Sequence, residues 1–234
     1  MKKTTLFSLI ALAAGLQLAS AGDITGTVTL KGTPPAERPI TPLKEDITCG
    51  RFYTDMPTTH FFVVGSKSEL ADVIVMLKGV GKSTGASAAP VTVDQKGCLY
   101  SPQIFAVQTG QKIMVKNSDP VMHNIHAVPA VDGNAEQNVP QMQGAGDITL
   151  SFDKPENFLK FKCDVHNWMF AWVTVVDSPY YAVTDKDGKF TIKNVPAGDY
   201  TIVALHRKAA PTGVEQKVTV TADGGKADFT LEVK

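Results

Sequence analysis

The sequence predicts an all-β protein, and three observations support this prediction. Patterned segments alternate apolar and polar residues over five to eight positions, which is the period of a strand with one buried face. Gly, Pro, Asn or Asp bounds each of these segments, as expected at turns. No segment has a convincing amphipathic helical period, and 66–72 is expected to form at most one helical turn. Regular strands separated by turn signals indicate β-sandwiches.

The N-terminus has the features of a secretory signal. Lys2 and Lys3 precede an apolar run over 6–18, and the small residues of Ala19–Ala21 follow. The run is too short for a membrane span, so we predict a signal peptide over 1–21 and an exported protein, in the bacterial periplasm, with no membrane span after cleavage. Removal of the two lysines from a chain with 23 basic and 23 acidic residues leaves a charge of about minus two. This charge implies no charge-driven partner such as nucleic acid.

The predicted strands follow one another along the chain with two interruptions. A small, polar, glycine-rich stretch over 79–90 has the composition of a linker. A second break falls in 177–188, where Pro179 and the Asp187-Gly188 pair interrupt the pattern. The clearest strands are 24–30, 70–79, 111–117, 158–163, 169–176, 189–205 and 214–233.

The three cysteines are Cys49, Cys98 and Cys163. Export permits disulfides, and an odd count leaves one thiol over. Because Cys163 lies close to His166 and Met169, we predict a Cys49–Cys98 disulfide and a Cys163 thiolate that binds a metal. The alternative is a buried, unreactive Cys163. The chain-entropy estimate gives such a disulfide about 4 kcal/mol of stabilisation.

The stretch CDVHNWM places Cys163, His166 and Met169 at intervals of three residues. Sulfur ligands combined with imidazole suit copper, above all in a site of two His, one Cys and a weak axial Met. The stretch supplies three of these four groups. His123 and His126 are the remaining histidines in the same part of the chain, and because residues three apart on a strand point to opposite faces, one of the two is expected to face the metal.

Two segments resemble the cupredoxins, or type 1 blue copper proteins, of the amicyanin-like kind. They are 101–128, SPQIFAVQTGQKIMVKNSDPVMHNIHAV, and 161–176, FKCDVHNWMFAWVTVV. In that family Asn commonly follows the first ligand His, as Asn124 follows His123 here. The resemblance covers about 88–177 and implies a Greek-key β-sandwich. It also implies one type 1 copper ion held by His123, Cys163, His166 and Met169.

The strand pattern agrees with this ligand set. Leu159, Phe161 and Cys163 fall on one face of a strand, so Cys163 is expected to point into the sandwich. The loop after it brings the other ligands to the same end, and a site built on strand ends suits single-electron transfer. Trp168 and Phe170 either form an apolar patch around an exposed edge of His166, through which related proteins pass electrons, or belong to the core.

The flanking segments resemble carboxypeptidase regulatory-like modules, which are small transthyretin-like β-sandwiches. The resemblance is carried by 181–208, with its Asp-Gly turn and VPAGDY turn, by the following 214–231, and by 24–35 and 70–79. It implies one discontinuous sandwich interrupted by the cupredoxin. The alternative is a contiguous C-terminal domain with an irregular N-terminal extension. The predicted parts are a signal peptide over 1–21, the first part of the regulatory-like sandwich over 22–83, the cupredoxin domain over 84–177, and the second part over 178–234.

Together these features predict a secreted mononuclear copper protein that carries single electrons between redox protein partners. The alternative is an extracytoplasmic binding or scaffold module with a structural or copper-delivery site. The sequence has no Ser-His-Asp set, paired carboxylates or phosphate loop, so enzyme activity is not expected.

Overall fold

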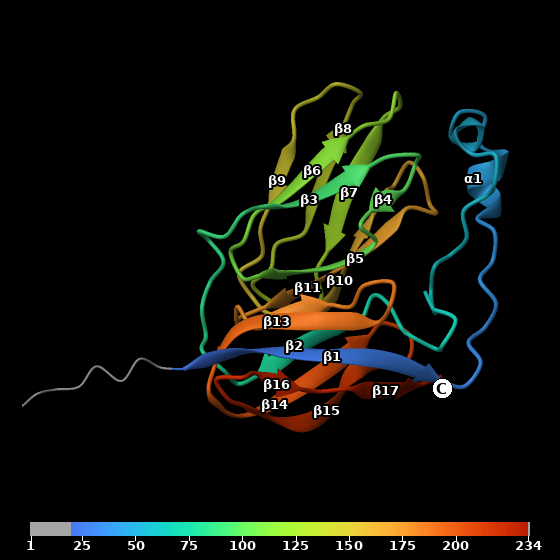
Figure 1. The fold of residues 1–234 in the computed structure, drawn as a ribbon. Helices are drawn as coiled ribbons and strands as arrows, with labels where there is room; N and C mark the ends of the chain where they lie inside the picture. The colour runs from blue at the N-terminus through green and yellow to red at the C-terminus, as the bar shows by residue number, and fades with distance from the viewer. Residues whose placement is uncertain (1–19, 234) are drawn as a thin grey trace, which may run out of the picture.

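The computed structural model describes residues 20–233 and confirms the all-β class (Figure 1). Its strands form four sheets, which pair into two β-sandwiches. The predicted signal peptide falls on residues outside the described range, except that Ser20 is described and Ala21 begins the first strand. Within the described range, none of the helices has the length and apolar character needed to cross a membrane.

One sandwich combines strands from both ends of the chain. Its first sheet has the order β13-β1-β16, with β17 also paired to β1, and its second has the order β12-β2-β14-β15. The strands are β1 (Ala21–Lys31), β2 (Ile74–Lys78), β12 (Tyr181–Val183), β13 (Lys189–Pro196), β14 (Gly198–His206), β15 (Ala210–Val220), β16 (Gly225–Lys226) and β17 (Phe229–Glu232). This pairing of early with late strands supports our proposal of a discontinuous domain.

The other sandwich is built from the strands between β2 and β12. Its sheets have the orders β5-β11-β10-β7-β8 and β4-β3-β6-β9. The strands are β3 (Val91–Gln95), β4 (Tyr100–Ser101), β5 (Ile104–Gln108), β6 (Ile113–Asn117), β7 (His123–Val128), β8 (Gln137–Gln141), β9 (Ile148–Leu150), β10 (Glu156–Lys162) and β11 (Phe170–Val176). Alternate residues of β10 are buried, including Leu159 and Phe161, as the period-two pattern predicts.

Residues 37–61, which we call the covering segment, leave the first sandwich after β1, extend along the second sandwich and return toward β2 of the first. They contain the helix α1 (Thr41–Glu45) and the 3-10 helix η1 (Cys49–Phe52), and α1 lies beside the β3–β11 sandwich in Figure 1. The sequence pattern did not predict α1, because a five-residue helix is too short to show a helical period. Pro42 lies in the first turn of α1, where proline favours the start of a helix. Leu43 and Cys49 are fully buried in the core of this sandwich.

The predicted disulfide between Cys49 and Cys98 is present, with 5.8 Å between the two Cα atoms. It ties the covering segment to the turn before β4, while Cys163 is a buried free thiol. The two sandwiches also contact each other directly. Ile74 and Leu205 from one pack with Ala106 from the other in a small apolar cluster.

His206 at the end of β14 makes the stability of the fold sensitive to acid. Its side chain is 3% exposed, and Nδ1 accepts hydrogen bonds from the backbone N–H groups of Lys208 and Ala209. Burial, assisted by the positive charge of Arg207, lowers the pKa of His206 from 6.5 to about 4. Below pH 6.5 the unfolded chain therefore binds a proton that the folded chain excludes.

We expect neutral His206 to make its full contribution to the free energy of unfolding above about pH 6.5. About 3 kcal/mol of this contribution should be lost as the pH falls toward 4. Urea unfolding at about pH 7.5 and about pH 4.5 measures the loss. In His206→Asn, whose amide oxygen can accept the same N–H groups, the difference between the two pH values should shrink by about 2 kcal/mol. An unchanged difference would contradict this assignment.

Candidate metal centre

The loop between β10 and β11 brings Cys163, His166 and Met169 together. The backbone N–H of Cys163 donates to the carbonyl of Met169 at 3.2 Å, and that of Met169 donates to the carbonyl of His166 at 3.0 Å. The backbone N–H of His166 points at the Cys163 sulfur, 3.4 Å away. These short-range bonds close the loop into a compact turn at the end of the sandwich.

His123, at the start of β7, completes a cluster with two of these residues. Its Nδ1 lies 3.0 Å from Nδ1 of His166, which in turn lies 3.8 Å from Sγ of Cys163. One donor atom from each of the three residues falls within 4.8 Å of the others. A metal bonded to two imidazole nitrogens at about 2.0–2.1 Å requires those nitrogens to lie within about 4 Å of each other. The three residues therefore fit a metal of the kind that binds two His and one Cys.

The cluster also favours the thiolate form that metal binding needs. Burial opposes ionisation of Cys163, but interactions with the imidazoles of His123 and His166 and hydrogen bonds from backbone N–H groups outweigh it, and the pKa of Cys163 falls to about 6. At neutral pH this thiol is therefore largely ionised, and a thiolate is the ligating form of cysteine.

Met169 is fully buried in the core of the same sandwich, one residue before β11. Its backbone hydrogen bonds hold it next to Cys163 and His166, and its role as the fourth ligand stays a prediction.

Asn124 links the His123 strand to the Cys163 loop. Its Oδ1 accepts a hydrogen bond from the backbone N–H of Asp164 at 2.7 Å and lies 3.2 Å from the Cys163 sulfur. Its Nδ2 donates to Asn138 on β8 at 2.7 Å. The side chain adjacent to His123 in sequence thus fixes the position of the loop that carries the thiol.

His126 lies on the opposite side of β7 and takes part in a different network. Its Nδ1 is 2.8 Å from the Asp164 carboxylate, and its Nε2 is 2.7 Å from that of Glu136. An ion pair with Lys162 and contact with His126 hold the pKa of Asp164 below its usual range. The strand period correctly separates the two histidines, and the structure brings His123, not His126, next to Cys163.

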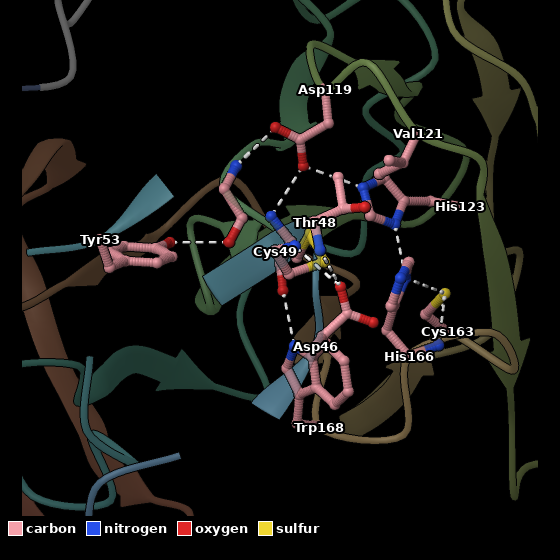
Figure 2. The surroundings of a disulfide bond; sticks show 12 residues. Asp46, Thr48, Cys49, Tyr53, Asp119, Val121, His123, Cys163, His166 and Trp168 are labelled. Carbon is pink, nitrogen blue, oxygen red and sulfur yellow. Dashed lines mark hydrogen bonds and ion pairs between the residues drawn. A yellow bond between two sulfur atoms is a disulfide. The ribbon is translucent and has the colours of Figure 1, made fainter. Parts of the chain in front are cut away.

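Asp119 supports the outer side of His123, a role that the sequence pattern did not reveal. Its Oδ2 lies 2.9 Å from Nε2 of His123 and accepts the backbone N–H of Cys98 at 2.7 Å, while Oδ1 accepts that of Gly97 at 2.7 Å. A carboxylate on the second ring nitrogen fixes the tautomer and leaves Nδ1 free to bind a metal. The turn residue Asp119 therefore connects His123 to the disulfide (Figure 2).

The edge of His166 is covered, which disfavours the interpretation that Trp168 and Phe170 form an apolar patch around an exposed edge of this ring. His166 is 7% exposed, and the Trp168 ring lies 5.1 Å from its ring. The indole N–H of Trp168 donates to the carbonyl of Cys98 at 3.0 Å. As Figure 2 shows, Asp46 and the disulfide lie over the same side. Asp46 accepts the backbone N–H groups of Thr48 and Cys49, which shapes η1.

Two further groups of possible ligands occur within residues 20–233. They are Cys49, Cys98 and His166, and Cys98, Asp119 and His123. Both depend on sulfurs that are joined in the disulfide, and a metal requires thiolates. The group of His123, Cys163 and His166 is therefore the candidate metal centre.

Comparison with known proteins gives partial matches. A family described as polysaccharide lyase family 4, domain II, matches residues 164–228, and no curated protein matches the chain. A Cu-containing nitrite reductase (NirK) from Thermus scotoductus SA-01 is similar at 22% identity, over 38% of this chain and 23% of its own, with a TM-score of 0.34.

Amicyanin structures are similar over a larger share of their own length. An oxidized proline-to-glycine mutant matches at 23% identity over 43% of this chain and 97% of its own, with a TM-score of 0.33. A reduced tryptophan-to-tyrosine mutant gives 23% identity over the same shares, with a TM-score of 0.34. The case for a metal centre therefore depends on the side chains described above.

Proposed function

We propose that this chain is an exported, periplasmic mononuclear copper protein that carries single electrons between redox protein partners. The observation that carries the proposal is the approach of two imidazole nitrogens and one buried thiol to a common point. Two His and one Cys with a weak axial Met are the donor set typical of electron-transfer copper.

His123 and His166, through Nδ1, and Cys163, through Sγ, would hold the ion, with Met169 as the weak fourth ligand. Bound copper would supply reversible one-electron chemistry. The chain itself would hold the donors in place: Asp119 fixes the His123 ring, and Asn124 fixes the Cys163 loop. Such preorganised ligands reduce the structural change that accompanies electron transfer.

Copper loading of the metal-free protein tests this proposal directly. Wild-type protein with Cu(II) should develop an intense visible thiolate-to-copper absorption band, and Cys163→Ser should abolish the band. His123→Gly should shift or remove the band, and added imidazole should restore it. His126→Gly is the matched control, because it lies three residues away on the same strand, and it should leave the band nearly unchanged.

Two outcomes of this experiment would overturn the proposal. One is wild-type protein that binds zinc alone or binds copper without the visible band. The other is the reverse result for the two histidine variants, which would show that His126 is the ligand.

The covering of His166 favours a second candidate, a structural or copper-delivery site in an extracytoplasmic scaffold module. An imidazole that is 7% exposed gives a redox partner little direct access. Electron self-exchange, measured by line broadening in NMR spectra of mixed oxidation states, separates the two candidates. Fast exchange supports the carrier, and absent exchange with release of copper to a chelating peptide supports delivery.

A further inference from the structure

A cavity lies where the two sandwiches and the covering segment meet. Its volume is about 440 Å³, which is in the range of small-molecule sites. The outer face of β10 and β11 forms its floor with Lys160, Phe170 and Trp172. Arg207 follows β14 and closes another side, and Trp168 from the metal-ligand loop is part of the wall.

The lining of the cavity combines aromatic rings with positive charges. Lys160 Nζ lies 4.5 Å from the centroid of the Phe170 ring, and Arg207 Cζ lies 4.6 Å from that of Trp172. Lys208 Nζ lies 4.5 Å from the Phe61 ring, and Arg38 also lines the cavity. Within residues 20–233, none of the lining side chains is acidic.

Arg207 is half-buried, and the structure gives it no carboxylate partner among the described residues. Burial lowers the pKa of Arg207, and the negative charge of the nearby Glu37 partly opposes this effect. The Glu37 carboxylate itself accepts hydrogen bonds from the Thr59 hydroxyl and the backbone N–H of Phe62. Stacking on aromatic rings offsets part of the cost of burying a guanidinium. An anion in the cavity would offset the rest.

We propose that this cavity binds a small aromatic carboxylate. A planar ring would pack against the Trp and Phe side chains, and a carboxylate would accept two parallel hydrogen bonds from the guanidinium of Arg207. The lysines around the cavity add to the preference for a negative charge. The proposal is independent of the proposed copper chemistry, and metal-free protein tests it.

The chain offers a built-in reporter for this site. It contains two tryptophans, Trp168 and Trp172, and both line the cavity. Benzoate should therefore change the tryptophan fluorescence of the metal-free full chain in a saturable way, and isothermal titration calorimetry should give the same dissociation constant. Cyclohexanecarboxylate tests the need for a planar aromatic ring, and benzamide tests the need for the negative charge. Each should bind about tenfold more weakly than benzoate or worse.

Substitution then locates the site. Arg207→Gln should weaken benzoate binding by about tenfold or more. Arg51→Gln is the matched control, because Arg51 is an exposed arginine of the covering segment outside the cavity. If Arg207→Gln does not fold, as judged by circular dichroism, Trp172→Leu takes its place with the same expected loss.

Equal affinity for benzoate and either analogue would overturn the proposal, and so would benzoate binding that neither cavity variant weakens. Failure of benzoate to bind would also overturn the proposal. If an acidic peptide binds instead, the cavity is assigned to a protein partner. None of these results depends on copper, so they are distinguishable from failure of the copper-loading experiment.

Discussion

Replacement of Asp119 by Ala is expected to lower the free energy of unfolding of the metal-free protein by about 3–5 kcal/mol. The Asp119 side chain is 5% exposed. Its two oxygens accept the backbone N–H groups of Gly97 and Cys98 and contact Nε2 of His123. The substitution leaves the buried groups of Cys98 and His123 and the partly buried N–H of Gly97 without a partner, and each unsatisfied buried group costs about 1–3 kcal/mol.

Urea unfolding measures this loss, with Asp147→Ala as the control. Asp147 is exposed in the turn before β9, so its removal should change the free energy of unfolding by less than about 0.5 kcal/mol. Asp119→Asn keeps one acceptor oxygen and should recover part of the loss. If Asp119→Ala is as stable as the control, the carboxylate does not have the role assigned to it.

Local sequence patterns predicted much of the candidate site, because the geometry of a strand and a short loop is set by neighbours in the chain. The alternation of Leu159, Phe161 and Cys163 predicted that the thiol faces inward, and all three are buried. Strand parity separated His123 from His126. The loop 163–169 could also be predicted, since its backbone hydrogen bonds join residues at most six positions apart.

The parts that the sequence did not predict depend on contacts between distant segments. Asp119 stands between β6 and β7, and its function depends on the Gly97–Cys98 turn that packs against it. The covering of His166 depends on residues 41–52, an interval without clear alternation. Arg207 reaches Trp172 because two sheets from different sandwiches meet.

Trp168 and Phe170 had two open interpretations, a surface patch or part of the core. Both are half-buried and line the cavity between the sandwiches. Strand alternation explains part of this result, since Phe170 and Trp172 share the outer face of β11. Alternation assigns such a face to solvent, and the covering segment and the neighbouring sandwich occupy that space instead.

Removal of the disulfide, as Cys49→Ser/Cys98→Ser, is expected to destabilise the protein by about 4 kcal/mol and to expose the candidate metal centre. The bond closes a loop between cysteines 49 positions apart in sequence, which restricts the unfolded chain. In the folded protein it holds η1 over His166, next to the bond between Trp168 and the Cys98 carbonyl. Loss of the disulfide should therefore loosen the covering segment more than the sheets.

The reactivity of Cys163 measures this loosening. Cys163 is 3% exposed and is the single thiol left in the double variant, because the chain has three cysteines. Its alkylation by iodoacetamide in metal-free protein should be at least about tenfold faster than in wild type, since local opening controls access. Hydrogen exchange should localise the opening to residues 41–53.

Tyr53→Phe provides the matched control for this prediction. It removes another link between the covering segment and the same turn, the hydrogen bond from the Tyr53 hydroxyl to the Gly97 carbonyl at 2.7 Å. One such bond contributes about 1 kcal/mol, so alkylation should accelerate much less than in the double variant. If the double variant loses stability while Cys163 reacts at the wild-type rate, the disulfide stabilises the chain without shielding the centre. In that case the β10–β11 loop and its own hydrogen bonds alone protect the thiol.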